Sequence, residues 1–329
     1  MRLRLLHKFA AVLVLVSVLP LTLLGFRLIS LGQLGVRTAI LELNLTAADK
    51  ISSEMNGFIN GADAALRTAM SAMARMDWEN KQTMLSSLLE TRREIRELSV
   101  LSRDGAEIVK ILSPYAGGDA ALKKYAKATG FAAARAGKRS ITVDPATRMA
   151  VFYYPFGKDM ALRAELDLPS FMDSLDLKMV GEKGFPLILD AEGRPMAWPG
   201  GVDAARAAEA ASWDVSRNAV KSLASGSAEF SDASGRAMLG AYSPISALGG
   251  AVVVSQPQEQ AYRYAMFMRR QAVYAVLLFL ALSVIAAWVL SRSLSKPITG
   301  LTRAAEYVAA GDFTHKAEVN TTDELRDLA

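Results

Sequence analysis

Residues able to do covalent or metal chemistry are scarce in this sequence of 329 residues. There is no cysteine, which excludes thiol chemistry, zinc fingers and iron–sulfur clusters. The two histidines, His7 and His315, lie near the ends, so a histidine-ligated metal in the middle of the chain is excluded as well. No nucleotide-binding glycine motif, nucleophile–histidine pair or acidic metal cluster stands out. The sequence therefore predicts a chain that is not an enzyme and that has no catalytic residue, cofactor or metal.

Charged and aromatic side chains between residues 139 and 167 could instead bind a small molecule. They combine charge or aromatic surface with predicted strand or turn positions, as do groups that orient a ligand in a pocket. The alternative is that alternating tyrosines pack one face of a strand and that the charges meet water. The six candidates are Arg139, Asp144, Arg148, Tyr153, Tyr154 and Asp167.

Charge is close to balanced, with 38 Lys and Arg against 33 Asp and Glu, and no basic patch is interleaved with aromatic residues. The sequence therefore carries no footprint of nucleic-acid binding. Hydrophobic residues make up 51% of the chain, and the mean hydropathy is +0.19. These values are high for a soluble protein and low for a polytopic one, so they predict a few spanning helices on a soluble body.

Two uncharged stretches are long enough to cross a membrane. The first, Phe9 to Gly25, follows a short basic tail, and the second, Ala272 to Leu290, has 19 residues with aromatic side chains near both ends. A cleaved signal peptide is the alternative for the first stretch, but no small-x-small cleavage site follows it. The basic tail predicts cytoplasmic termini and an external region from about residue 32 to residue 270, across the inner (plasma) membrane.

Between the spans, the apolar pattern predicts two α+β modules with the same order of elements, each an antiparallel sheet with helices on its flanks. Steps of three and four from Ile40 to Met76 predict one long helix whose methionines pack the core. Asp77 is expected to cap a second helix with apolar positions up to Leu98. Trp198 and Trp213 are expected in the core of the second module. The strand candidates are 98–103, 106–112, 140–144, 149–156 and 160–168, then 185–190, 194–198, 228–231, 236–242 and 250–256, and the helical candidates are 119–136, a turn from Pro169, 203–223 and 258–271.

This order of a span, a long helix, two modules and a second span resembles the double Cache sensor, a PAS-like extracytoplasmic module of bacterial receptors. The resemblance covers about residues 35 to 265. A single long Cache domain, or two less similar modules, are the alternatives. The resemblance implies that the membrane-distal module binds a small molecule between its sheet and a capping segment, within residues 98–168. It also implies that the second module transmits the signal.

The resemblance implies positions for ligand contacts as well. Asp144 and Asp167 fall where amino-acid-binding members of the family carry a ligand-contacting aspartate. The Arg-x-Trp-Tyr run of those members is missing from the capping segment, which here reads KKYAKATGFAAARAGKR. The implied ligand is therefore a carboxylate or another small polar molecule, bound by residues among the six candidates.

The segment after the second span carries a more specific pattern. Its apolar residues recur at steps of three and four, as in the seam of a helix bundle: Ile298, Leu301, Ala305 and Val308. It resembles a HAMP domain through Pro297, Gly311-Asp312-Phe313 and Asp323-Glu324. The resemblance implies a role in signal relay for Pro297, Gly311, Asp323 and Glu324. Because a HAMP domain is a parallel dimeric four-helix bundle, a homodimer is implied.

These observations predict a membrane-anchored receptor that senses a small external ligand and relays the signal through HAMP to an output domain. The alternatives are the sensor half of a histidine kinase or diguanylate cyclase, the sensor half of a methyl-accepting chemoreceptor, and a binding or decoy protein without output. Because Ala329 falls inside the second HAMP helix, a truncated sequence is expected. The expected boundaries are 1–8 (tail), 9–31 (first span), 32–97 (stalk helices), 98–176 (distal module), 177–262 (proximal module), 263–271 (linker helix), 272–290 (second span) and 291–329 (HAMP).

Overall fold

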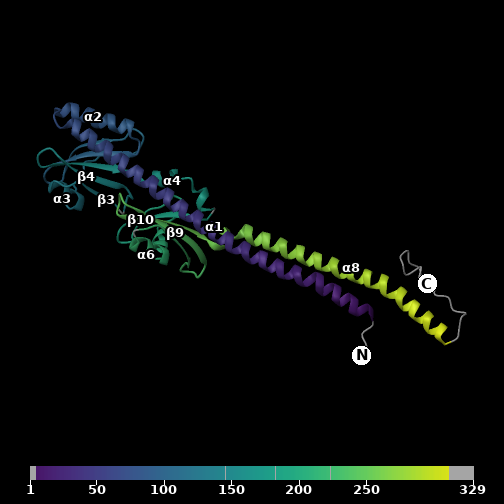
Figure 1. Cartoon of the computed structure of the whole chain (residues 1–329). Helices are drawn as coiled ribbons and strands as arrows, with labels where there is room; N and C mark the ends of the chain where they lie inside the picture. Colours follow the sequence, from purple (N-terminus) through teal and green to yellow (C-terminus); the bar gives the residue numbers. More distant parts are fainter. Residues whose placement is uncertain (1–4, 145, 182, 223, 311–329) are drawn as a thin grey trace. The chain divides into compact units, whose positions relative to one another are not determined.

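The computed structural model describes residues 5–310 except 145, 182 and 223. The chain divides into two compact units, one formed by Met1–Arg37 with Arg263–Ala329 and the other by Thr38–Tyr262. The helices are α1 (Leu5–Met73), α2 (Trp78–Thr91), α3 (Thr129–Arg135), α4 (Leu168–Ser174), the 3₁₀ turn η1 (Leu177–Val180), α5 (Ala204–Ala211), α6 (Asp214–Lys221), α7 (Gln258–Ala261) and α8 (Arg263–Ala309) (Figure 1). The strands are β1 (Ile95–Leu101), β2 (Glu107–Leu112), β3 (Ser140–Val143), β4 (Ala150–Phe156), β5 (Met160–Leu166), β6 (Phe185–Leu189), β7 (Pro195–Ala197), β8 (Gly226–Ser231), β9 (Ala237–Ile245) and β10 (Gly250–Pro257).

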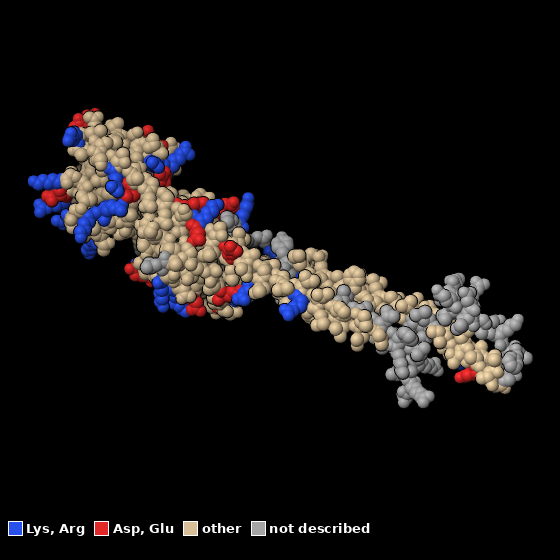
Figure 2. All heavy atoms as spheres, viewed as in Figure 1, with Lys and Arg blue, Asp and Glu red and all other residues tan. Residues whose placement is uncertain are grey.

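The described part of the first unit consists of the N-terminal part of α1 and of α8. Apolar side chains cover these helices, and Phe26 and Leu278 are 76% and 60% exposed. Figure 2 shows mostly uncharged atoms along both of them. Two stretches are long and apolar enough to cross a membrane, one within Thr22–Met73 and one at Met266–Leu290, where the mean hydropathy reaches 2.6. Both overlap the predicted spans.

The predicted relay residue Pro297 lies inside helix α8, which continues past it to Ala309. A proline has no backbone N–H, so α8 lacks one intrahelical hydrogen bond at this position. The predicted relay residues Gly311, Asp323 and Glu324 lie outside the described residues.

The second unit contains two antiparallel five-stranded sheets. The distal sheet has the order β2-β1-β5-β4-β3 and the proximal sheet the order β7-β6-β10-β9-β8, which is the same path repeated along the chain. The predicted α+β class and the predicted recurrence of elements are confirmed. One face of each sheet packs on α1, whose Met55, Ile59 and Met73 are 0% exposed in a single shared core. The opposite faces pack on α3 in the distal module and on α5 and α6 in the proximal module.

The second helix ends earlier than the sequence predicted. Asp77 caps α2 as expected, and its carboxylate accepts the N–H of Asn80 at 2.9 Å. The helix stops at Thr91, and Ile95 and Leu98 are buried in β1 instead. A register shift between Ile95 and Glu97 makes a step of three residues in the strand, which imitates the spacing of a helix.

The helix predicted at 119–136 forms only over Thr129–Arg135. Residues 113–128, here called the cap segment, contain neither a helix nor a named strand. Their backbone bonds to the β1–β2 hairpin: the N–H of Glu107 donates to the carbonyl of Lys123 at 2.9 Å, and the N–H of Tyr125 donates to the carbonyl of Gly105 at 2.7 Å. These pairings replace the hydrogen bonds that a helix would need.

Candidate ligand-binding site

A row of polar side chains crosses the distal sheet on the face turned away from α1. Ser99 on β1 lies opposite Lys110 on β2 and opposite Arg163 on β5, and Arg163 lies opposite Tyr153 on β4. Residues opposite one another in a sheet project from the same face. Their chain neighbours, such as Leu162, project from the other face into the core against α1. Strand alternation thus separates an apolar face from a polar one.

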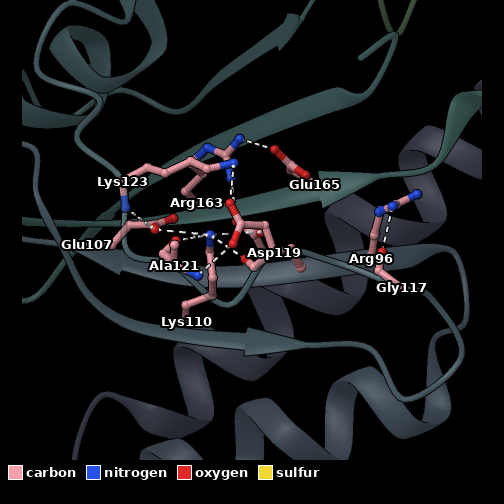
Figure 3. Close-up of polar contacts among 10 residues, drawn as sticks. Arg96, Glu107, Lys110, Gly117, Asp119, Ala121, Lys123, Arg163 and Glu165 are labelled. Atoms are coloured by element: carbon pink, nitrogen blue, oxygen red, sulfur yellow. Dashed lines mark hydrogen bonds and ion pairs between the residues drawn. The ribbon is translucent and has the colours of Figure 1, made fainter.

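Arg163 lies at the centre of the polar face and is only 2% exposed. One guanidinium nitrogen, Nη1, donates to Oε1 of Glu97 at 2.8 Å, and the other, Nη2, pairs with Glu165 (Figure 3). The ring of Tyr125, from the cap segment, covers the guanidinium with its centroid 4.2 Å away. Burial opposes the charge of Arg163, but Glu165, Tyr125 and Tyr153 together outweigh burial and keep the pKa of Arg163 above its ordinary value. Arg163 is therefore a buried cation whose two terminal nitrogens are both paired with carboxylates.

Lys110 is the second buried cation, and it joins the sheet to the cap segment. Its Nζ lies 3.5 Å from Oε2 of Glu97 and 3.2 Å from Oε2 of Glu107. The same ammonium donates to the carbonyl oxygens of Asp119 at 3.2 Å and Ala121 at 3.0 Å (Figure 3). The Lys110 side chain is 2% exposed, so these four acceptors stand in for water.

Two more contacts fasten the cap segment over the polar face. Nη2 of Arg96 donates to the carbonyl of Gly117 at 2.6 Å, and the N–H of Lys123 donates to Oε2 of Glu107 at 2.7 Å (Figure 3). The two sheet residues in these contacts are Arg96, a donor on β1, and Glu107, an acceptor on β2. The cap segment therefore closes over the charges through polar contacts, which a ligand of suitable chemistry can replace.

Three buried polar atoms on this face have no hydrogen-bond partner among the described residues: Ser99 Oγ, Glu107 Oε1 and Arg163 Nε. Their residues are at most 5% exposed. Each such atom costs about 1–3 kcal/mol, and a missing ligand is one explanation for it. Two further atoms of this kind in the described part of the chain, Asn44 Nδ2 and Trp213 Nε1, lie elsewhere. The unpaired atoms thus concentrate beneath the cap segment.

Burial also shifts the protonation equilibria of this face. It raises the pKa of Glu97, and the nearby Glu165 raises it further, while Arg163 and Lys110 oppose the rise. Burial likewise raises the pKa of Tyr153, which stays neutral. Several perturbed titratable groups on one enclosed face are typical of a functional site.

The proximal sheet has the same topology but an apolar row at its centre. Leu187 on β6 lies opposite Val253 on β10, which lies opposite Tyr242 on β9. Leu187 and Val253 pack beneath α5 and α6 together with Trp213, which confirms Trp213 as core, and Trp198 is partly buried against the same cluster. A charged row at the centre of the sheet is therefore specific to the distal module and is not required by the fold.

The six residues predicted from the sequence do not converge on the polar face, and Tyr153 is the one of them that lies on it. Tyr154, the next residue along β4, projects toward α1 and donates to Asp63 at 2.6 Å. Arg139 pairs with the same carboxylate. Burial and the hydrogen bond to Asp63 raise the pKa of Tyr154. Tyr154 and Arg139 thus connect the distal sheet to the long helix.

The other three predicted residues bond to a turn, to a helix end and to the proximal module. Asp144 accepts the N–H of Ala146 at 2.9 Å in the β3–β4 turn. Arg148 donates to the backbone carbonyl of Trp198 at 3.3 Å, and its guanidinium lies 4.6 Å from the centroid of the Trp198 ring. These two contacts join the distal module to the proximal one. Asp167 caps α4 by accepting an N–H of its first turn at 2.9 Å. These side chains support turns and the contact between the modules.

Sequence reasoning missed the charged residues at the centre of the face. Arg163 and Glu165 alternate with apolar residues in the run MALRAEL, which places both on one face of a strand. A sheet with helices on both faces buries such positions, so charge in the middle of a predicted strand was the available signal. The missed residues are Glu97, Ser99, Glu107, Lys110, Tyr125, Arg163 and Glu165.

Comparison with known proteins identifies the C-terminal segment. Residues 289–329 match the HAMP domain family. The segment is a HAMP domain, as predicted. A methyl-accepting chemotaxis protein from Pseudomonas putida, McpQ, is 44% identical to the chain over 54 residues, which are 16% of this chain and 8% of McpQ. The chain thus spans a small part of the length of that relative.

Solved sensor domains share the fold of the region between the spans. The periplasmic sensory domain of the Campylobacter jejuni chemoreceptor Tlp1 superposes with a TM-score of 0.53 and 11% identity, covering 69% of this chain and 98% of that domain. The extracellular domain of rpHK1S-Z16, described as a histidine kinase, gives a TM-score of 0.53 and 16% identity, covering 66% of this chain and 93% of that domain. The region before the HAMP domain therefore has the fold of these solved sensor domains, as predicted.

Proposed function

We propose that this chain is the sensing and relaying part of a transmembrane signalling receptor with no catalytic role of its own. The observation that carries the proposal is the buried charged face beneath the cap segment, in a sensor fold joined through a candidate span to a HAMP domain. Three unpaired buried polar atoms destabilise a module with a purely structural role, whereas in a receptor they are available to bind a ligand.

The ligand is a small molecule that binds between the polar face and the cap segment. Ser99, Glu107 and Arg163 offer it unpaired atoms, and Tyr153 offers its phenolic hydroxyl on the same face. The other five residues predicted from the sequence hold the surrounding turns and helices in place, so they affect the site indirectly.

The sensor lies outside the inner membrane and the HAMP domain lies in the cytoplasm, because a basic tail precedes the first span. The receptor is a homodimer, since Ile298 and Val308 are 38% and 47% exposed on α8 and a short HAMP helix cannot bury its seam alone. The match to McpQ favours a methyl-accepting chemotaxis output over a kinase or cyclase.

The test is a ligand screen on the full chain in lipid nanodiscs, read by thermal unfolding. A ligand at about 100 times its Kd stabilises the folded state by about 2.7 kcal/mol, which a melting curve resolves. We expect hits whose melting shift is lost in Ser99→Ala and Tyr153→Phe. Tyr242→Phe, in the central row of the proximal sheet, is the matched control and should keep the shift. Hits that Ser99→Ala and Tyr153→Phe leave unchanged would reject this face as the site.

A further inference from the structure

The edge strand β3 lines a cleft between the two modules. The cleft has a volume of about 440 Å³, and Ile141, Thr142 and Val143 form one of its walls. Side chains of successive strand residues point to opposite faces, so three consecutive residues line one cavity only where the strand presents its edge to it. The other wall comes from the β6–β7 turn, β7 and the β9–β10 turn of the proximal module. A volume of about 300–1,000 Å³ is typical of sites for small ligands.

The backbone of β3 has unpaired polar groups along this edge. The N–H of Asp144 donates to the carbonyl of Met149 at 3.0 Å, which shows which residue pairs of the β3–β4 ladder are hydrogen-bonded. Such pairs alternate in an antiparallel ladder, so Thr142 bonds to β4, whereas Ile141 and Val143 direct their N–H and C=O groups away from β4. No described residue bonds to these outward groups. The edge therefore offers two donors and two acceptors over about 6.8 Å.

The other edges of the two sheets are protected against the addition of a strand. The cap segment covers the edge of β2 through the bond between Glu107 and Lys123. Strand β7 has three residues and begins with Pro195, which has no N–H, and β8 carries the exposed charge of Glu229. Covering segments, short length, proline and charge are the means by which proteins block edge strands. Strand β3, with the sequence SITV, has neither proline nor charge, and its β-branched residues favour strand pairing.

The walls of the cleft also determine which side chains an added strand needs. Residues opposite one another share a face, so those opposite Ile141 and Val143 would contact the apolar cluster that includes Met196 and Leu248. The residue between them would lie beside the hydroxyl of Thr142. The β3 strand of a second copy has this apolar–polar–apolar pattern as well, but it belongs to a five-stranded sheet, which a cleft of about 440 Å³ cannot admit. A short extended peptide fits.

We propose that the cleft between the modules binds an extended peptide with an apolar–polar–apolar pattern, which adds to β3 as an antiparallel sixth strand of the distal sheet. Main-chain hydrogen bonds supply the affinity of such additions, and pockets for alternate side chains supply the specificity. Because the two walls come from different modules, the bound peptide holds the distal sheet against the β6–β7 turn. This second site is independent of the ligand beneath the cap segment, so the receptor proposal stands whether or not peptides bind here.

The first experiment measures hydrogen exchange of β3 in the full chain in lipid nanodiscs, with the probe acetyl-Ser-Val-Thr-Val-Ser-amide. The outward amides of Ile141 and Val143 should exchange rapidly in the free protein. At about nine times the Kd of the probe, about one tenth of the protein is free, so their exchange should slow about tenfold. N-methylation of both valines of the probe, whose N–H groups face β3, should abolish the protection. N-methylation of its threonine, whose N–H faces away, should preserve it.

The second experiment blocks the edge on the protein. Val143→Pro removes an outward N–H without removing a bond to β4, which edge strands tolerate, and it should abolish the protection of Ile141 by the probe. Val143→Thr keeps the N–H and a similar shape, so it is the matched control and should retain the protection. The methylated probes act on wild-type protein, so that test does not depend on the folding of a variant.

Three results would overturn the inference. The first is the absence of protection at millimolar probe, or equal protection by the probe methylated at its valines. The second is a loss of protection in Ser99→Ala, which would place the peptide beneath the cap segment instead. The third is protection of β3 that rises with protein concentration in the absence of the probe, which would show that the edge pairs with a second copy of the chain.

Discussion

Replacing Arg163 by methionine is the most direct test of the buried charge cluster. Arg163 is 2% exposed and pairs with Glu97 and Glu165, which are also largely buried. Removing one partner of a buried pair leaves the other charge uncompensated and typically costs about 3–5 kcal/mol. Arg163→Met leaves Glu165 without its cationic partner and leaves Glu97 with Lys110 alone, and it also loses the stacking on Tyr125. We therefore expect about 4 kcal/mol of local destabilisation.

The double variant separates electrostatics from packing. Glu97→Gln removes one of the two carboxylates that pair with Arg163, so the double variant Glu97→Gln with Arg163→Met should cost less than the sum of the two single variants by about 1–3 kcal/mol. Arg194→Met is the matched control, since Arg194 pairs with Asp190 at 2.6 Å but is 73% exposed. An exposed pair of this kind contributes about 1 kcal/mol or less.

The measurement is urea-dependent hydrogen exchange of the full chain in nanodiscs, followed on peptides from β1 and β5. These two strands carry the pair and report on the distal module rather than on the candidate spans. A cost for Arg163→Met no larger than that of Arg194→Met would refute the reasoning. So would strict additivity of Glu97→Gln and Arg163→Met, because it would show that the two side chains do not interact.

Three other predictions concern packing and pH. Gly130→Ala should destabilise the distal module by about 1–3 kcal/mol, because the added Cβ would lie 2.2 Å from the buried Tyr153 ring. Gly57→Ala on α1 is the control: its Cβ meets no atom within 4 Å, so it should be neutral or stabilising by up to about 1 kcal/mol, and urea denaturation compares the two variants. Burial alone would raise the pKa of Asp232, but hydrogen bonds from the β8–β9 turn lower it to about 2 from 3.8. The ionised carboxylate therefore stabilises the folded state above pH 3.8, and this stabilisation is lost as the pH falls through about 2. In Asp232→Asn that pH dependence should disappear from the acid side of the stability profile. Glu97 acts with the opposite sign. Its raised pKa favours the folded state below the ordinary value of 4.5, and this stabilisation is lost as the pH rises through the folded-state pKa, so Glu97→Gln should flatten that part of the profile.

The layout of the molecule could be predicted from its sequence because each element carried its own periodic signal. The methionine spacing predicted the buried face of α1, and Asp77 marked the start of α2. The cap segment could not be predicted in this way. Its run of alanine and lysine favours a helix locally, and the hydrogen bonds of its backbone to Gly105 and Glu107 override that preference.

The candidate site was harder to predict, because it depends on register between strands that are far apart in the chain. The sequence suggested charged residues near turns, where Asp144 and Asp167 proved to stabilise local structure. The residues that meet are Lys110 and Glu97 on neighbouring strands, with Arg163 from a strand more than fifty residues later. Such a meeting follows from the sheet order, which periodicity does not reveal.

The strands that carry the charges also connect the site to the relay. β1 and β5 present charged residues to the cap segment and apolar residues, including Leu98 and Leu162, to α1 on the other side. A ligand that changes the packing on one face therefore acts on strands that α1 contacts on the other, and α1 continues along the chain into the first candidate span. At the far end of the proximal module, Gln256 of β10 donates to Asn44 of α1 at 2.7 Å, just before the chain enters α7 and α8. The same helix is thus bonded to the strand that leads to the HAMP domain, and a ligand biases the relay only to the extent that it favours one packing of these contacts over another.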